Sequence, residues 1–185
     1  ERFDKDFQVS VNMSPVQFRE DDAIFAGNWL KCLEEHALHG SNMVVEITEG
    51  LLLNVEPEVI NKLLWLRDIG MQVAVDDFGT GYSSLSYLQK FDIDYLKIDQ
   101  AFIRNLGSDT NDIALSEAII MMAHKLGLRV IAEGVESEVQ ASLLKSAGCD
   151  YVQGYLYSRP IRPEDLEVML EQQGRSLRKV SQASV

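Results

Sequence analysis

Three stretches of the chain repeat one pattern, in which a glycine begins a short apolar run and a carboxylate follows six residues after the glycine. They cover residues 40–46, 70–76 and 127–133, and a fourth stretch, 148–153, is similar but ends on a glutamine. A glycine in the left-handed conformation commonly ends a helix. An apolar run that follows it and ends on a charge is typical of a strand buried on both faces. The pattern therefore predicts helices and buried strands in alternation.

The remaining sequence fits the same alternation. Two further strands are predicted over residues 9–12 and 95–99. Amphipathic helices are expected at about residues 23–38, 58–69, 84–90 and 111–126, and after residues 137 and 163. Pro57 and Pro163 suit the first turn of a helix, and Ser137 with Gln140 forms a candidate capping box. Alternating strands and helices predict a parallel sheet with right-handed crossovers.

The predicted fold class is α/β, a TIM-type (β/α)8 barrel of which about six of eight strand-helix units are present. A doubly wound sheet usually gathers its ligand groups at one switch point, whereas here nearly every strand ends in a polar side chain, as in a barrel. A closed barrel typically needs about 250 residues. We therefore expect residues 1–172 to form a barrel that is incomplete at its N-terminus, domain-swapped or paired with another copy, followed by a polar tail over residues 173–185.

Charge and cysteine content exclude several classes of protein. The formal net charge is −12 and no basic stripe is evident, so we expect no binding to long nucleic acid. The two cysteines lie far apart in the sequence, which indicates neither a disulfide framework nor a zinc knuckle and fits a reducing cytoplasm. No apolar run approaches the roughly 20 residues that a membrane-spanning helix needs.

The polar residues at the predicted strand ends would gather around one axis in a barrel. Converging carboxylates repel one another unless cations lie between them. Carboxylate and amide oxygens suit Mg²⁺ or Mn²⁺ better than zinc, and two ions are expected, with Asp76 bridging them and Asp77 binding one. This combination points to metal-assisted hydrolysis of a phosphoester. The strand-end residues are Asn12, Glu46, Asp76, Asp77, Lys97, Asp99, Glu133 and Gln153.

Two features of this set remain open from the residues alone. Lys97 either steadies a metal-bound hydroxide or a phosphate oxygen, or forms an ion pair with Asp99 or another carboxylate. The glycine-rich segment after Asp77 either approaches a phosphate, acts as a mobile gate, or is a tight turn from strand to helix. Its predicted flexible residues are Phe78, Gly79, Thr80 and Gly81. The chain lacks the other kinase motifs and the common nucleotide-binding fingerprints.

Six motifs in order resemble those of the EAL-domain family of bacterial cyclic-di-GMP phosphodiesterases. The resemblance extends from about residue 9 to residue 170. The motifs are Val-Asn-Met-Ser (11–14), Glu-Ile-Thr-Glu (46–49), Asp-Asp-Phe-Gly-Thr-Gly-Tyr-Ser-Ser (76–84), Lys-Ile-Asp (97–99), Ala-Glu-Gly-Val-Glu (132–136) and Gln-Gly-Tyr (153–155).

The resemblance implies a signalling enzyme that hydrolyses cyclic di-GMP to linear pGpG with Mg²⁺ or Mn²⁺. One ion would be held by Asn12, Glu46 and Asp76, and the second by Asp76 with Asp77. Lys97 would orient the catalytic water, and Glu133 would assist the ions or that water. Glu49 would anchor the loop over residues 77–84, which the family uses to couple metal binding to dimerisation. Asp99, Glu136 and Gln153 would support the metal ligands from behind or stabilise the product.

One family feature is absent from the 185 residues. The Glu-Ala-Leu tripeptide, whose glutamate is a metal ligand in the family, does not occur. We expect it upstream of Glu1, on one of the strands missing from the barrel. The resemblance also implies a homodimer and accompanying sensory or GGDEF-type domains in the parent chain. Two alternatives stay open: a receptor that binds cyclic di-GMP without hydrolysing it, and a barrel enzyme for another phosphorylated metabolite.

Overall fold

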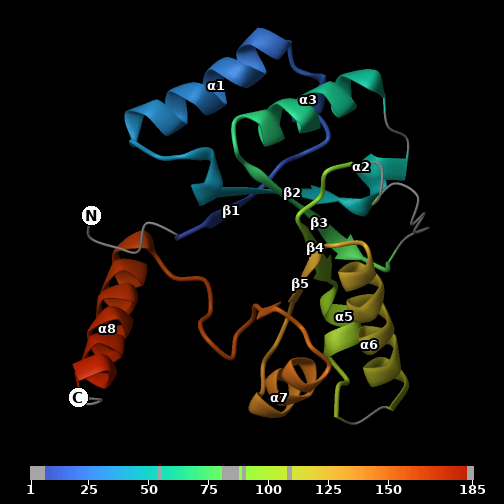
Figure 1. The fold of residues 1–185 in the computed structure, drawn as a ribbon, viewed down its shortest axis with the longest axis vertical. Coiled ribbons are helices and arrows are strands. Elements are labelled where there is room, and N and C mark those ends of the chain that lie inside the picture. Colours follow the sequence, from blue (N-terminus) through green and yellow to red (C-terminus); the bar gives the residue numbers. More distant parts are fainter. Residues whose placement is uncertain (1–6, 54–55, 81–87, 89–90, 108–109, 183–185) are drawn as a thin grey trace.

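A curled parallel sheet organises the chain, as the computed structural model shows for residues 7–53, 56–80, 88, 91–107 and 110–182. In this described part the sheet has six strands in the order β1-β2-β3-β4-β5-β6, and every neighbouring pair is parallel (Figure 1). The strands are β1 (Val9–Asn12), β2 (Met43–Thr48), β3 (Gln72–Phe78), β4 (Tyr95–Ile98), β5 (Arg129–Ala132) and β6 (Tyr151–Val152). All six predicted strands are confirmed.

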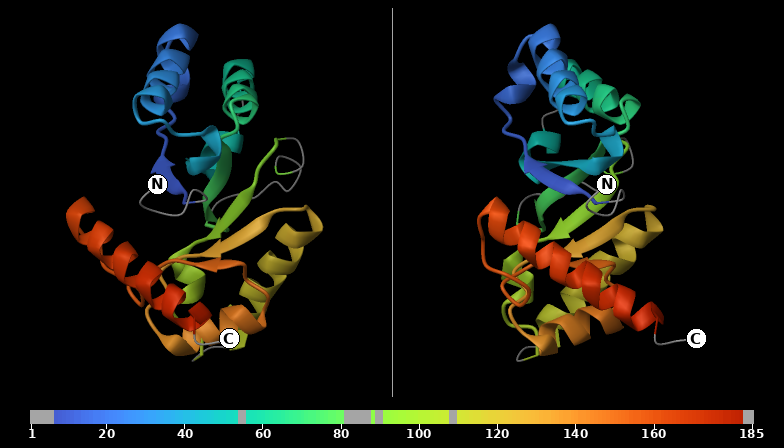
Figure 2. Two further views of the ribbon diagram at one scale, coloured as in Figure 1. Left: turned by 60° about the vertical axis from the view of Figure 1, so that its left-hand side comes forward. Right: turned by 90° about the vertical axis from the view of Figure 1, so that its left-hand side faces the viewer.

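Helices connect the strands and lie along the outer side of the curled sheet. The α-helices are α1 (Asp22–Glu35), α2 (Glu49–Leu53), α3 (Pro57–Asp68), α5 (Gln100–Ile103), α6 (Thr110–Lys125), α7 (Glu138–Ser146) and α8 (Pro163–Gln182). Two short 3₁₀ helices, η1 (Gln17–Arg19) and η2 (Gly40–Asn42), precede α1 and β2. Figure 2 shows α1 and α3 together at one end of the sheet and α5, α6 and α7 at the other, whereas α8 lies to one side of both groups in Figure 1. The fold is therefore part of a TIM-like (β/α)8 barrel, as predicted.

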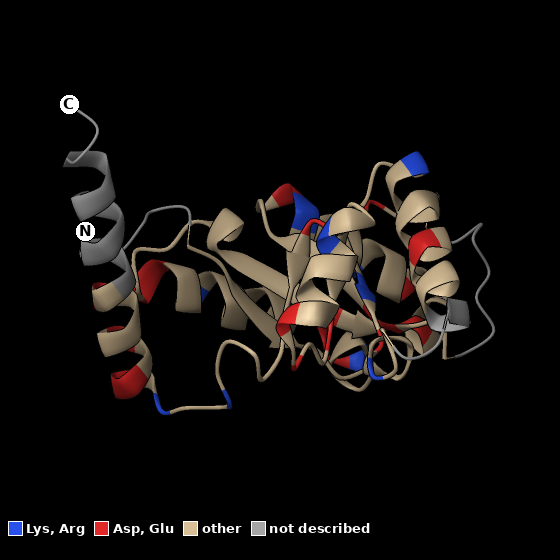
Figure 3. Ribbon diagram, turned by 90° about the horizontal axis from the view of Figure 1, so that it is seen from below, with Lys and Arg blue, Asp and Glu red and all other residues tan. Residues whose placement is uncertain are grey.

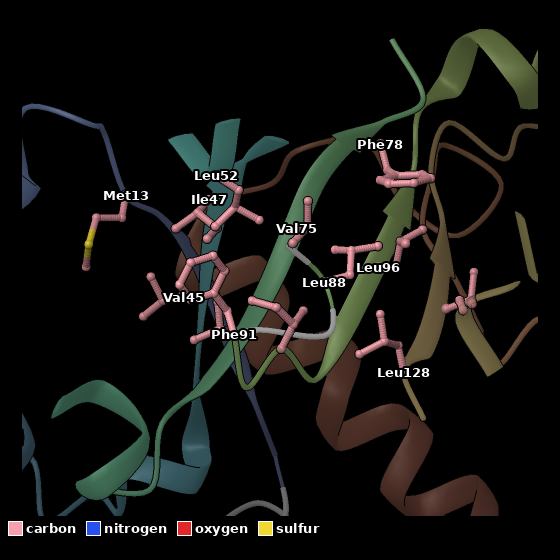
Figure 4. Packing of buried hydrophobic residues seen from close by; sticks show 14 of the residues in the cluster. Met13, Val45, Ile47, Leu52, Val75, Phe78, Leu88, Phe91, Leu96 and Leu128 are labelled. Carbon is pink, nitrogen blue, oxygen red and sulfur yellow. The ribbon is translucent and has the colours of Figure 1, made fainter. Parts of the chain in front are cut away.

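Side-chain alternation along the strands separates two faces of the sheet. Val45, Ile47 and Val75 point toward the helices and are fully buried, together with Leu96 (Figure 4). The core between sheet and helices continues through Phe91, whose ring lies beneath the same strands. Because successive residues of a strand face opposite sides, the residues between these apolar ones line the concave face. The main apolar core thus lies on the convex side of the sheet, between the strands and the helices.

The predicted helix ends agree with the structure at most positions. Pro57 opens α3, Pro163 opens α8, and the side chain of Ser137 accepts a hydrogen bond from the Gln140 N–H in a capping box. The predicted helix over residues 84–90 falls outside the described residues except at residue 88. Helix α8 continues through residue 182, so residues 173–182 of the predicted polar tail are helical. Among the described helices, none is long and apolar enough to cross a membrane.

Gly40 differs from the prediction. It does not end a helix in the left-handed conformation, because α1 already stops at Glu35 and Ala37 adopts the positive φ of 51°. Gly40 instead begins η2, where a Cβ atom would lie 2.0 Å from the Ile69 carbonyl oxygen. The requirement for glycine is therefore close approach of two backbones, not chain reversal.

Candidate active site

Charged side chains form one layer of the concave face. Val44, Ala74 and Tyr95 make a small buried apolar cluster there, with Ile131 packed against it. Two residues farther along each of these four chain segments, the side chain on the same face is charged. The four residues of this charged layer are Glu46, Asp76, Lys97 and Glu133.

The ammonium group of Lys97 lies at the centre of this layer. Its Nζ atom is 2.6 Å from Glu46 Oε2, 2.8 Å from Asp76 Oδ1 and 2.5 Å from Glu133 Oε1. The Lys97 side chain is only 3% exposed, and that of Glu46 is 7% exposed. The predicted convergence of Glu46, Asp76 and Glu133 is therefore present, and Lys97 contacts all three carboxylates at once.

A β-bulge brings a further carboxylate to the same place. Val75 pairs with Leu96 and Phe78 pairs with Ile98, so Asp76 and Asp77 together lie opposite Lys97 alone. Asp77 has a φ of 55°, which is uncommon for a residue other than glycine. Adjacent residues of a regular strand face opposite sides, but a bulge locally breaks this alternation. Carboxylate oxygens of Asp76, Asp77 and Glu133 consequently lie within 4.8 Å of one another.

Burial and neighbouring charges shift the protonation of this layer. Burial alone would lower the pKa of Lys97, but hydrogen bonds to Asp76, Glu133 and Glu46 outweigh it and raise that pKa above its ordinary value. Burial raises the pKa of Glu133, partly offset by Lys97. Burial and the adjacent Asp76 raise the pKa of Asp77. Lys97 therefore stays a cation, while the surrounding carboxylates repel one another.

The donor set fits a hard divalent cation. Asp76, Asp77 and Glu133 offer carboxylate oxygens close enough to share one ion, and such oxygens are typical ligands of Mg²⁺ and Mn²⁺. Asn12 is the last residue of β1 and pairs in register with Glu46, which places the two side chains on the same face of neighbouring strands. The site can thus hold cations next to a fixed ammonium group.

Glu49 joins this site to the glycine-rich segment after β3. Its Oε2 atom accepts a hydrogen bond of 3.2 Å from the Gly79 N–H, and the carboxyl group is buried. The Thr80 hydroxyl donates to the Asp77 carbonyl at 2.9 Å. Phe78 departs from the predicted flexible loop, because it is the last residue of β3 and its ring packs in the core. Gly81 lies outside the described residues.

The other predicted site residues lie on the loops that follow β4, β5 and β6. Asp99 caps α5, where its carboxylate accepts a hydrogen bond of 2.7 Å from the Ala101 N–H, and it also interacts with Asp77. Glu136 is exposed, and its N–H donates to the Gln140 side chain. Gln153 is exposed directly after β6. Within the part of the chain that the structure describes, Lys97 forms its ion pairs with other residues than these three.

Two of these loops are held together through their backbones, which the sequence analysis missed. The Val135 N–H donates to the Gln153 carbonyl at 3.0 Å, and the Leu156 N–H donates to the Val135 carbonyl at 3.0 Å. A Cβ atom on Gly154 would lie 2.2 Å from the Val135 carbonyl oxygen. Gly154, directly after Gln153, was the sequence signal that could have indicated this close approach of two backbones. This loop contact fixes the segment that carries Glu133.

Glu46 and Asp76 also differ from their predicted places. Both were expected where a strand leaves the core, yet each lies two residues before the end of its strand. The strands extend farther because Ile47 and Phe78 are still buried against the helices. The charges therefore sit inside the concave face instead of projecting into solvent.

Comparison with known proteins gives one consistent family. The sequence model of the EAL domain matches residues 1–160. The signalling protein YkoW of Bacillus subtilis is 40% identical over 169 residues, which cover 91% of this chain and 21% of YkoW. The cyclic di-GMP phosphodiesterase NbdA of Pseudomonas aeruginosa is 43% identical over 138 residues, 75% of this chain and 18% of NbdA. The chain thus spans about a fifth of the length of these relatives.

Solved structures show the same similarity. The PaMucR phosphodiesterase in complex with c-di-GMP aligns with a TM-score of 0.78 and 37% identity, covering 86% of this chain and 64% of that one. The manganese and cyclic di-GMP complex of BlrP1 from Klebsiella pneumoniae aligns with a TM-score of 0.77 and 31% identity, covering 84% of this chain and 39% of the BlrP1 chain.

Proposed function

This chain belongs to the EAL-domain family, and we propose that it is the catalytic module of a phosphodiesterase that hydrolyses cyclic di-GMP to linear pGpG. The observation that carries the proposal is the cluster of Glu46, Asp76 and Glu133 around Lys97, with Asp77 brought alongside by the bulge. Relatives named as cyclic di-GMP phosphodiesterases and the c-di-GMP complex of PaMucR support the choice of substrate.

The proposal includes Mg²⁺ or Mn²⁺ as cofactor, with two ions bound. Asn12, Glu46 and Asp76 hold one ion, and Asp76 with Asp77 holds the other. Divalent ions at such a site activate water and neutralise negative charge on a phosphoryl group. The manganese complex of BlrP1 supports this choice of cofactor.

Side chains around the ions complete the proposed chemistry. Lys97 orients the attacking water, since its ammonium is buried and fixed by hydrogen bonds. Glu133 either adds to the ligands or holds the same water. Glu49 anchors the segment after Asp77 through Gly79. Asp99, Glu136 and Gln153 support the loops around the substrate.

The proposal extends to the surroundings of the module. We place the barrel within residues 1–172 and the protein in the cytoplasm, where it self-associates as a homodimer. Sensory or GGDEF-type domains belong to the rest of the parent protein. Support for a combined architecture comes from MucR of Pseudomonas aeruginosa, named as a bifunctional diguanylate cyclase and cyclic di-GMP phosphodiesterase.

The proposal is tested by following the conversion of cyclic di-GMP to pGpG by the full-length protein with Mg²⁺ or Mn²⁺. Asp76→Asn should abolish turnover, because it removes the carboxylate proposed to bridge both ions. Glu117→Gln is the matched control, since Glu117 is exposed on α6 away from the charged layer, and its rate should equal that of the natural protein. Tight binding of cyclic di-GMP without turnover would favour the receptor alternative. Hydrolysis of a different phosphoester in a substrate screen would favour the alternative of a barrel enzyme for another phosphorylated metabolite.

A further inference from the structure

The carboxylates that surround Lys97 include those proposed to hold the ions. Glu46, Asp76 and Glu133 each place an oxygen within 2.8 Å of its Nζ atom. Oxygen ligands approach Mg²⁺ or Ca²⁺ at roughly 2.0 to 2.6 Å. An ion bound by these residues would therefore share their carboxylates with the ammonium group.

We infer that Lys97 is a built-in counter-ion, which holds the carboxylates together before metal binds and competes with the incoming divalent ion for them. The inference rests on the proposed function, because that function assigns Glu46 and Asp76 as metal ligands and places Glu133 beside the ions. Its new content is a cost: the ammonium must release at least part of its contacts before an ion can be bound.

Charge and burial set the direction of this effect. Lys97 and Glu46 are almost inaccessible to solvent, so water screens their interactions poorly. In the absence of an ion, the ammonium offsets repulsion among Glu46, Asp76 and Glu133. Once a divalent ion enters, the same ammonium repels it, and Coulomb's law makes that repulsion twice the one between two single charges.

Lys97 also organises the ligands in advance, which would favour metal binding. This contribution is shared with the backbone, however. The bulge fixes Asp76 and Asp77. Glu133 follows β5, and its N–H donates to the Ile98 carbonyl at 3.1 Å. Because these features hold the carboxylates without help from Lys97, competition outweighs preorganisation.

The test is the dissociation constant for Mn²⁺, measured by electron paramagnetic resonance of free Mn²⁺ on the full-length protein without nucleotide. Lys97→Met removes the charge and keeps the length of the side chain. It should bind Mn²⁺ about tenfold more tightly than the natural protein, with a lower melting temperature in the absence of metal. Lys97→Gln is a second neutral variant, whose amide can still donate hydrogen bonds to the carboxylates, and it should also bind more tightly.

Two control variants separate charge from burial. Lys97→Arg keeps the positive charge and should bind Mn²⁺ no more tightly than the natural protein. Lys62→Met removes another buried ammonium, which donates to the carbonyls of Phe18 and Glu20 in the segment before α1. It should lower the melting temperature and leave the Mn²⁺ dissociation constant unchanged.

The outcomes distinguish this inference from the proposed function. If the natural protein binds Mn²⁺ and both neutral variants bind it equally or more weakly, the inference is overturned and the proposed function is not. Tighter binding by Lys97→Arg overturns it as well, because the charge would still be present. Failure of the natural protein and of every variant to bind Mn²⁺ would overturn the metal assignment and the inference together.

Discussion

The two ends of the sheet hold their polar groups in opposite ways. At one end, the rim, three carboxylates share a single ammonium group and a fourth lies beside them. At the other end, the floor, each polar group is satisfied by a neighbour from the same chain. The rim consists of Glu46, Asp76, Asp77, Lys97 and Glu133. The floor consists of Gln72, Asp94, Tyr95, Arg129, Asp150 and Tyr151.

A repeated dipeptide builds much of the floor. Asp94 precedes Tyr95, and its carboxylate accepts a hydrogen bond of 2.9 Å from the Val73 N–H of the neighbouring strand. Asp150 precedes Tyr151 and accepts from the Val130 N–H in the same way, at 2.8 Å. Each aspartate thus tethers the start of the preceding strand.

Arg129 completes the floor by lying over an aromatic ring. Its guanidinium group is 4.3 Å from the centre of the Tyr95 ring, which in turn meets the Tyr151 ring edge to face. Charge at the floor is therefore covered, whereas charge at the rim is left in excess. In barrel folds the corresponding ends serve stability and catalysis. Figure 3 shows acidic and basic residues interspersed along the rest of the described chain.

The largest effect is expected at the rim. Glu46→Gln should reduce turnover of cyclic di-GMP by about 1,000-fold, the scale on which loss of one charge-stabilising group acts in enzymes. The melting temperature of this variant should stay close to that of the natural protein, because the glutamine amide fills the same buried space as the glutamate carboxylate. Rates and thermal melts of the full-length protein check both. Full activity of the variant would contradict the contrast between rim and floor. So would a large loss of stability in a variant whose folded molecules keep their activity.

The next effect concerns the floor. Tyr95 is 3% exposed, so Tyr95→Ala should lower the free energy of unfolding by about 3–5 kcal/mol, as large-to-small changes in a core do. Tyr157 is 57% exposed, and Tyr157→Ala should cost less than about 0.5 kcal/mol. Urea unfolding measures both variants. A Tyr95→Ala protein of natural stability would show that the floor is not a stabilising region.

A smaller effect is expected where the rim depends on its loops. Gly154→Ala forces a Cβ atom against the Val135 backbone and should cost about 1–3 kcal/mol while also lowering turnover, because Glu133 lies on the displaced loop. Gly27→Ala is the control: it lies within α1 with no atom in the way, and should gain roughly 0.5–1 kcal/mol. Lost stability without lost turnover would mean that the loop contact does not position the rim.

The smallest effect is a pH dependence at the floor. Burial alone would raise the pKa of Asp150, but hydrogen bonds from His124 and the Val130 N–H outweigh it and lower that pKa. A carboxyl group with a lowered pKa in the folded state stabilises the protein above its unfolded pKa, near 4, and loses that contribution as the pH falls further. Asp150→Asn should therefore cost roughly 1 kcal/mol at pH 7.

That difference should shrink below about pH 4, where Asp150 becomes protonated first in the unfolded chain and, at lower pH, in the folded protein. Urea unfolding of both proteins between pH 3 and 7 measures it. A difference that grows on acidification would reverse the assigned sign.

Much of this fold follows from local sequence. The glycine, apolar and carboxylate pattern located three strands, and Pro57 and Pro163 located two helix starts, because strand burial and helix termini depend on neighbouring residues. The short helices α2 and α5 were missed, since four or five residues carry no helical periodicity. The special role of Gly40 depends on Ile69, which is distant in the sequence.

The sequence predicted which residues form the candidate site better than it predicted how they contact one another. The strand pattern gathered Glu46, Asp76 and Glu133, and a parallel sheet brings such residues together. The contact of Lys97 with all three depends on register between strands, which the sequence does not encode locally. The bulge at Asp77 likewise has no signature beyond two adjacent aspartates.

The bulge has a consequence for protein engineering. Asp76 and Asp77 reach the same place only because the backbone there contains one residue more than its neighbour. A designer who grafted these side chains onto a regular strand would send one carboxylate toward the helices. Transfer of the site to another scaffold therefore requires copying a backbone irregularity, because deleting either aspartate would restore regular pairing up to Phe78 and leave one carboxylate at this place instead of two.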